Sequence, residues 1–114
     1  MLPTEITLHQ QTRMLEIAFD DGNRYQLSHE LLRVYSPSAE VTDTDGSNNL
    51  QVGKKEVEIR QINPMGTYAI HIEFDDAHNS GIYTWEYLHH LGENQERLWQ
   101  DYLQRLSDAG WKHQ

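Results

Sequence analysis

The chain has 114 residues, 37% of them hydrophobic, with a mean hydropathy of −0.79 and a formal net charge of −9. This length predicts one domain over residues 1–114, and the acidic balance argues against nucleic acid or an anionic membrane surface as a partner. The sequence holds no cysteine for thiolate metal sites, no apolar run of bilayer-spanning length and no signal-like start, so we expect a soluble, cytoplasmic protein.

Alternating apolar residues predict three antiparallel strands at the start of the chain. In residues 5–10 and 13–19, hydrophobic side chains occupy every second position, which is the period of a strand that buries one face. Residues 20–23 hold a glycine and an asparagine, which tolerate positive φ and therefore favour a tight turn. Residues 24–27 then predict a returning strand, so this region is expected to be a three-stranded meander.

A short helix is predicted after the meander. Ser28 can accept hydrogen bonds as an N-cap, and Leu31 and Tyr35 lie on one face of a helix over residues 29–35. Pro37 disfavours its continuation, because the residue before a proline avoids the helical conformation.

The polar segment 42–49 predicts a mobile, solvated loop. It contains two aspartates and a glycine, which invites comparison with a calcium-binding loop. With Gly46 at the sixth position of the EF-hand pattern, Val41 and Val52 fall where that pattern needs oxygen ligands. We therefore predict a turn here and not a calcium site.

The middle of the chain predicts two further strands. Val57 and Ile59 share one face of the first, and residues 67–75 alternate most clearly of all, with Tyr68 the first of four side chains expected to face the core. Residues 63–66 hold a proline and a glycine and predict the turn between them.

Helices are predicted to end the chain. Residues 82–83 predict a short extended piece, and Thr84 can cap a helix that Gly92 would end. Residues 93–110 show the apolar spacing of a C-terminal helix. Together the elements predict an α+β domain of two layers, a mainly antiparallel sheet of about five strands with helices packed on one face.

His78 lies in an acidic turn and has two interpretations. It either stabilises its own turn, with Asp75 or Asp76 fixing its tautomer, or forms a weak metal or partner contact. A metal site would need His78 and Asp76 to meet His89 or His90. The last two point about 100° apart on a helix and cannot act as one clamp. His78 is thus the weak candidate for a metal ligand, and we predict no metal or cofactor.

The aromatic side chains Tyr83, Trp85 and Tyr87 also have two interpretations. They either pack the helix on the sheet or form, with His78, a contact surface for another protein. The apolar face of residues 93–110 is compatible with packing on the sheet or with self-association. We therefore expect an unknown protein partner and a monomer or weak homodimer.

No catalytic constellation is visible in the sequence. Ser28 and His29 are neighbours, which do not face each other on a helix. Ser36 and Ser38 lack the Gly-x-Ser-x-Gly elbow of a nucleophilic serine. We therefore predict that the protein is not an enzyme.

Two stretches resemble the gamma-butyrobetaine hydroxylase-like N-terminal domain family, a domain of unknown function. They are LSHELLRVYSPSAEV (27–41) and NPMGTYAIHIEFDDAHNSGIYTWEYLHHLG (63–92). The resemblance implies a structural zinc held by three cysteines and one histidine. The matching positions here are Ser36, Ser38, Val41 and His78, so the chain resembles bacterial stand-alone members that lack the thiolates.

The resemblance also suggests a function. Related domains occur beside a separate oxygenase domain, which is absent here, and fused to ATPases that carry iron–sulfur clusters. It therefore implies a non-catalytic binding or adaptor domain with a link to iron–sulfur cluster handling. The alternative is a zinc-binding accessory domain that uses His78 with imidazole or carboxylate ligands in place of thiolates.

Overall fold

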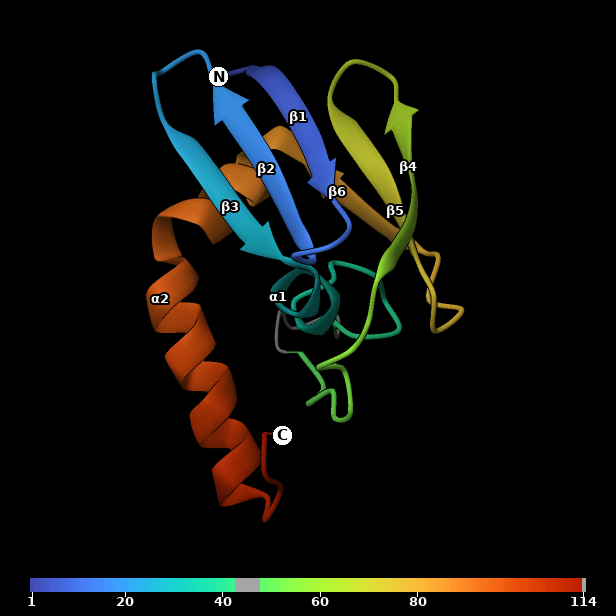
Figure 1. Ribbon diagram of the computed structural model, residues 1–114, viewed down its shortest axis with the longest axis vertical. Coiled ribbons are helices and arrows are strands. Elements are labelled where there is room, and N and C mark those ends of the chain that lie inside the picture. Colours follow the sequence, from blue (N-terminus) through green and yellow to red (C-terminus); the bar gives the residue numbers. More distant parts are fainter. Residues whose placement is uncertain (43–47, 114) are drawn as a thin grey trace.

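The computed structural model describes residues 1–42 and 48–113. Two three-stranded antiparallel sheets, a short helix and a long C-terminal helix make up the fold (Figure 1). The α+β class is confirmed, but the expectation of one sheet of about five strands is wrong, because the six strands separate into two sheets. In chain order the elements are β1 (Pro3–His9), β2 (Met14–Phe19), β3 (Arg24–Ser28), α1 (His29–Val34), β4 (Ile59–Met65), β5 (Ala69–Phe74), β6 (Gly81–Thr84) and α2 (Trp85–Asp108).

The first sheet, β1–β2–β3, is the predicted meander. Leu15 pairs with Leu8 on one side and Leu27 on the other, so the alternating pattern places apolar side chains of all three strands on one face. Gly22 has φ +89° in the β2–β3 turn, where the Asp21 side chain accepts a hydrogen bond from the Asn23 amide at 2.9 Å. Local turn chemistry therefore fixes the register of this sheet.

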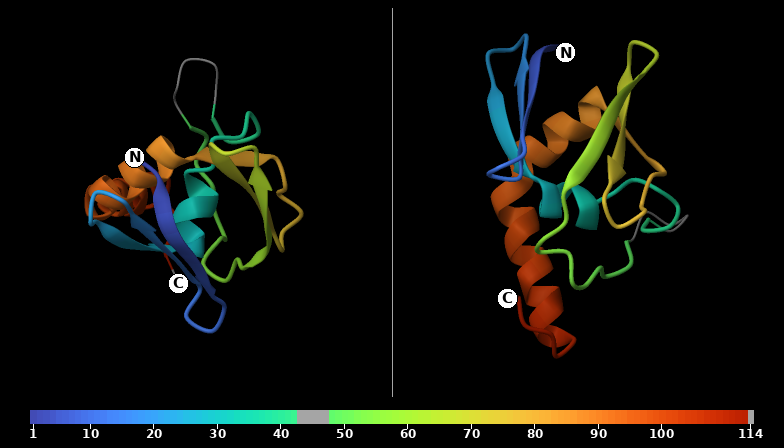
Figure 2. Two further views of the ribbon diagram at one scale, coloured as in Figure 1. Left: turned by 90° about the horizontal axis from the view of Figure 1, so that it is seen from above. Right: turned by 45° about the vertical axis from the view of Figure 1, so that its right-hand side comes forward.

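Helix α1 lies between the two sheets, as the view from above shows (Figure 2). Ser28 caps it as predicted, accepting a hydrogen bond from the Leu31 amide at 3.0 Å. All six of its residues are buried, and α2 covers one side of it, since Val34 packs against Tyr102 and Leu106. Residues 43–47, which contain most of the predicted polar loop and its calcium-like pattern, lie outside the described residues.

The second sheet, β4–β5–β6, differs from prediction at its first turn. The expected turn at residues 63–66 comes late, because β4 continues through Pro64 to Met65. An edge strand tolerates proline, which cannot donate to the ladder, and β4 lies at the edge of its sheet. Tyr68 was expected inside, but β5 begins only at Ala69, so Tyr68 lies in the turn and is 55% exposed.

Helix α2 is continuous over 24 residues, so the prediction that Gly92 ends a helix is wrong. A Cβ on Gly92 would lie only 2.3 Å from the Tyr25 ring, so the glycine lets the helix approach β3 closely. Figure 1 shows α2 bending between its first turns and its long C-terminal part. Thr84 caps it as expected, accepting from the Tyr87 amide at 3.2 Å.

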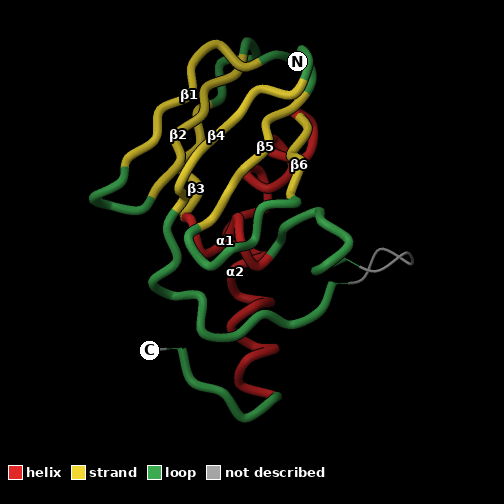
Figure 3. Tube along the Cα trace, turned by 90° about the vertical axis from the view of Figure 1, so that its right-hand side faces the viewer, coloured by secondary structure: helices red, strands yellow, loops and turns green. Residues whose placement is uncertain are grey.

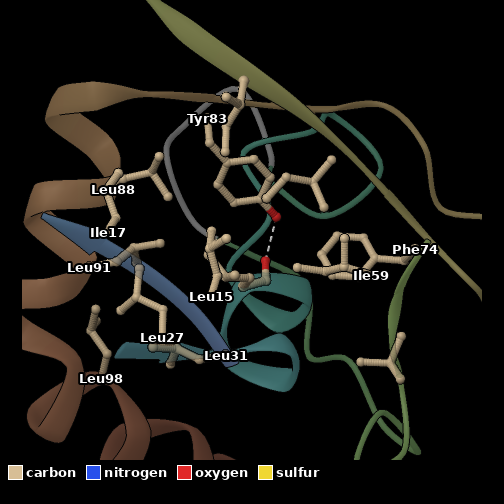
Figure 4. Close-up of a cluster of buried hydrophobic side chains, with 14 of the residues drawn as sticks. Leu15, Ile17, Leu27, Leu31, Ile59, Phe74, Tyr83, Leu88, Leu91 and Leu98 are labelled. Carbon is tan, nitrogen blue, oxygen red and sulfur yellow. Dashed lines mark hydrogen bonds between the residues drawn. The ribbon is translucent and has the colours of Figure 1, made fainter. Parts of the chain in front are cut away.

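The main core lies where both sheets meet α1 and the first part of α2 (Figure 4). Tyr83 is fully buried there, and its hydroxyl donates a 2.5 Å hydrogen bond to the Leu32 carbonyl of α1. Burial raises the pKa of Tyr83 far above its usual range. Within residues 1–42 and 48–113, neither helix is long and apolar enough to cross a lipid bilayer. The labelled core side chains are Leu15, Ile17, Leu27, Leu31, Ile59, Phe74, Tyr83, Leu88, Leu91 and Leu98.

Candidate functional site

The loop that follows α1 meets the turn between β5 and β6 through a direct side-chain contact. Ser36 Oγ lies 2.8 Å from His78 Nε2, although the two residues are 42 positions apart. Both are buried, with 0% of Ser36 and 3% of His78 exposed. The fold thus brings together Ser36 and His78, and the Ser38 amide also donates to Ser36 Oγ, so three of the four positions that the family resemblance had placed in one site lie together.

The hydrogen-bond partners of His78 fix its protonation. Its Nδ1 lies 3.2 Å from Glu40 Oε2, and an ionised carboxylate only accepts hydrogen bonds. Nδ1 therefore carries the proton, and Nε2 accepts from the Ser36 hydroxyl. Burial, followed by the nearby Arg33 guanidinium, lowers the pKa of His78, which keeps the ring neutral.

Two more serines complete a closed hydrogen-bond network. Ser80 Oγ donates to Glu40 Oε1 at 2.9 Å and is itself bonded to Ser38 Oγ. The backbone amide of Ser38 donates to Ser36 Oγ, and that of Glu40 donates to Ser38 Oγ. The bonds from Ser80 and His78 lower the pKa of Glu40. We call Ser36, Ser38, Glu40, His78 and Ser80 the serine–histidine cluster, in which every polar side chain has a partner.

Asp76 anchors the same turn from the other side. Its Oδ2 accepts from Arg33 Nε at 2.9 Å and from Lys54 Nζ at 2.6 Å, and its Oδ1 accepts from the His78 amide. Burial opposes ionisation of Asp76, but the bonds from Lys54 and Arg33 outweigh it and lower its pKa to about 2. The prediction that Asp75 or Asp76 fixes the His78 tautomer is wrong, because Glu40 holds the ring and Asp76 holds the backbone.

The order Ser36–His78–Glu40 is that of a nucleophile, a base and an orienting carboxylate. The Ser36 hydroxyl, however, has no exposed surface. A Cβ at Gly81 would lie 2.9 Å from Ser36 Oγ, so backbone also covers this side of the hydroxyl. A substrate carbonyl needs to come within about 3 Å of a nucleophile. In this conformation the cluster therefore joins two loops and leaves no space for a substrate.

The residues proposed as metal ligands do not converge. His89 Nε2 bonds Asp21 at 2.7 Å and its Nδ1 bonds Glu93 at 3.0 Å, so its partners differ entirely from those of His78. His90 is exposed and stacks on Tyr87. Within the part of the chain that the structure describes, no three or more His, Asp or Glu side chains form a group that could hold a metal ion.

The aromatic residues predicted as a contact surface divide into two kinds. Tyr83 is in the core, and His78 is in the serine–histidine cluster, so neither reaches the surface. Trp85 and Tyr87 are half-buried. The Tyr87 hydroxyl donates to the Tyr35 carbonyl at 2.5 Å, which ties α2 to the end of α1.

Sequence reasoning missed two exposed apolar side chains of the second sheet, one in the β4–β5 turn and one on β6. Tyr68 is 55% exposed and Ile82 is 40% exposed. Trp85 adjoins Tyr68, since the Trp85 amide donates to the Tyr68 carbonyl at 3.2 Å and its indole Nε1 donates to the Thr67 carbonyl at 2.8 Å. The alternation of side chains along β6 places Ile82 and Tyr83 on opposite faces of the strand. It does not show which of the two faces the rest of the protein covers.

Comparison with known proteins identifies the family. No protein of curated function matches the chain. Two solution NMR structures share 46% and 39% sequence identity, with TM-scores of 0.85 and 0.82. They cover 98% and 97% of this chain, which covers 84% and 88% of theirs.

A crystal structure from Acidithiobacillus ferrooxidans, of a DUF971 family protein with unknown function, shares 37% identity with a TM-score of 0.68. The match covers 79% of this chain and 91% of that chain. The family model for the gamma-butyrobetaine hydroxylase-like N-terminal domain matches residues 6–89. With more than two thirds of its residues inside that match, the chain belongs to the gamma-butyrobetaine hydroxylase-like N-terminal domain family.

Proposed function

We propose that the protein is a non-catalytic binding module that contacts another protein through the exposed end of its second sheet. The observation that supports this most is the exposure of Tyr68, which adjoins the half-buried Trp85, and of Ile82 on β6. We call these three residues the hairpin-end surface. Tyr and Trp contribute strongly to protein interfaces, because they bury much apolar area and keep a polar group for hydrogen bonding.

Trp85 is held in place before any partner arrives. Its indole and backbone N–H groups both donate to carbonyls of the β4–β5 turn, at Thr67 and Tyr68. Side chains that are already ordered lose less conformational entropy on association. This surface therefore suits a contact whose geometry is set in the free protein.

The serine–histidine cluster supports the module indirectly. His78 and Ser36 hold the turn at the opposite end of β5 and β6, one strand length from Trp85. The proposed partner surface therefore differs from the predicted one: it keeps Trp85, adds the exposed Tyr68 and Ile82, and leaves out the buried His78 and Tyr83. The family resemblance implies that the partner belongs to iron–sulfur cluster handling, and this part of the proposal rests on the resemblance alone.

A quantitative pull-down tests the proposal. The wild-type chain and a Tyr68→Ser/Ile82→Thr variant are used as baits in a native lysate, and recovered proteins are quantified by mass spectrometry. Both side chains are exposed, so the variant should fold. Leu2→Ser is the matched control, because Leu2 is an equally exposed apolar side chain elsewhere. We expect the double variant to lose partners that wild type and control retain. Equal recovery by all three baits would contradict the proposal.

A further inference from the structure

The fold gathers all the lysines of the sequence around one pocket. Lys54, Lys55 and Lys112 line a pocket of about 110 Å³. The first two precede β4 and the third lies in the C-terminal tail, which turns back beside α2 (Figures 1 and 3). Lys112 is 57 residues from Lys55 in the sequence, so only the fold brings these lysines together.

The pocket has a fixed apolar floor and an aromatic rim. Tyr102 and Leu106 of α2 line it and are buried, whereas Trp111 is 55% exposed. The Tyr102 hydroxyl donates to the Gln51 carbonyl at 2.8 Å, and the Trp111 amide donates to the Leu106 carbonyl at 2.8 Å. These bonds hold both lysine-bearing segments against the same helix.

Two of the three lysines in the pocket have no acidic partner among the described residues. Glu30 is the only acidic residue that lines it, and His113 Nε2 already bonds Glu30 at 2.8 Å. Lys54 is bonded to Asp76, but Lys55 and Lys112 lie within 4.0 Å of no acidic side chain among the described residues. By contrast, four arginines elsewhere in the chain form ion pairs with carboxylates, namely Arg13, Arg24, Arg33 and Arg97.

We propose that this lysine pocket binds a small phosphate-type oxyanion. Each ammonium group offers three N–H donors, and lysine binds phosphate as a point charge. Neighbouring cations without carboxylate partners repel each other, and a bound dianion would relieve that repulsion. A volume of about 110 Å³ admits only a small group. The net charge of −9 disfavours a polyanion such as nucleic acid.

The anion is either free phosphate or the head of a small phosphomonoester. The exposed indole of Trp111 adjoins the lysines and offers an apolar face to a ring carried by such an ester. The pocket lies at the C-terminal end of α2, and the hairpin-end surface lies at its N-terminal end. Since α2 has 24 residues, the two sites lie at opposite ends of a long helix and share no residue.

The test is an NMR titration of the ¹⁵N-labelled chain with sodium phosphate at neutral pH, with ionic strength held constant by sodium chloride. Phenyl phosphate and sodium acetate are titrated in parallel. We expect saturable amide shifts at Lys54, Lys55 and residues 111–113 with phosphate but not with acetate. Tighter binding of phenyl phosphate would support the phosphomonoester, and equal binding would support free phosphate.

The substitution arm uses a double variant and a control of equal charge. Lys55→Gln/Lys112→Gln should weaken phosphate binding about tenfold or more, since two charge contacts are removed. Arg60→Gln/Arg97→Gln removes two exposed cations elsewhere and should bind as wild type does. Shifts that are linear, equal in acetate, or unchanged in the lysine variant would overturn the proposal.

Discussion

The serine–histidine cluster and the lysine pocket are both polar assemblies built from distant parts of the chain, yet they differ in how their charges and hydrogen bonds are satisfied. In the cluster, Ser36, Glu40 and His78 use each other as partners, and the centre is buried. In the pocket, Lys55 and Lys112 form no ion pair with a carboxylate in the described part of the chain.

This difference predicts that the cluster governs the stability of the fold, whereas the pocket governs the binding of a ligand. A buried polar group without a partner costs about 1–3 kcal/mol, so a closed network strongly resists the loss of any member. Exposed cations cost little by themselves and remain available to a ligand. We therefore expect changes in the cluster to alter folding, and changes in the pocket to alter ligand binding alone.

The largest effect is expected for His78→Ala. The change deletes both ring hydrogen bonds and leaves the Ser36 hydroxyl buried without its acceptor, so the free energy of unfolding should fall by about 3–4 kcal/mol. Urea unfolding at neutral pH measures this fall. His90→Ala is the control, because His90 is exposed on α2, and it should cost less than about 1 kcal/mol. Equal unfolding midpoints for both variants would contradict the closed cluster.

A slightly smaller loss of stability is expected when the pH is lowered, because the fold contains a second buried imidazole. His29 is fully buried, its Nδ1 accepts from the Ile59 amide at 3.3 Å, and burial lowers its pKa from 6.5 to about 4. The unfolded chain therefore binds a proton at His29 more readily than the folded protein does. The contribution of His29 to stability is complete above pH 6.5 and is lost as pH falls toward 4, by up to about 3 kcal/mol.

Urea unfolding at a series of pH values checks this, in wild type and in His29→Asn, whose amide oxygen can still accept from Ile59. The variant should show a shallower decline below pH 6.5. An identical decline in wild type and variant would show that another group dominates.

Ser36→Ala should have an intermediate effect of about 1–2 kcal/mol. It removes the donor to His78 Nε2 and the acceptor of the Ser38 amide, but leaves only a small cavity. Ser80→Ala at the exposed edge of the same cluster should cost less. Thermal unfolding of the two variants checks this gradient, and a larger loss from Ser80→Ala would place the centre of the cluster elsewhere.

The smallest effect on stability is expected for Lys55→Gln. An exposed lysine without a carboxylate partner contributes little, so the free energy of unfolding should change by less than about 0.5 kcal/mol. The same variant should bind phosphate more weakly. Marked destabilisation, measured in the same urea series, would mean that the pocket is structural like the cluster.

Local sequence patterns predicted the parts of the fold that depend on neighbours in the chain. The meander follows from alternation and the glycine turn, and the caps at Ser28 and Thr84 need only the first turn of each helix. Gly92 was misassigned because a glycine after an apolar run has the form of a helix end. Its actual role depends on Tyr25, 67 residues earlier, which no local pattern reveals.

The candidate sites were also predicted only in part, because they depend on contacts between distant parts of the chain. The family resemblance indicated that Ser36 and His78 occupy one site, but nothing in the sequence marked Glu40, which holds the ring. The convergence of Lys55 and Lys112 depends on how the C-terminal tail folds back on α2. Tyr68 was expected inside because the alternation extends one residue beyond the strand, which begins at Ala69.

The protonation of His78 tests the closed cluster most directly. Long-range ¹H–¹⁵N NMR spectra of its imidazole should show, at neutral pH, a neutral ring with the proton on Nδ1 and none on Nε2. Because burial lowers its pKa, this pattern should persist as pH falls below 6.5. A proton on Nε2, or a charged ring at neutral pH, would contradict the network through Ser36 and Glu40.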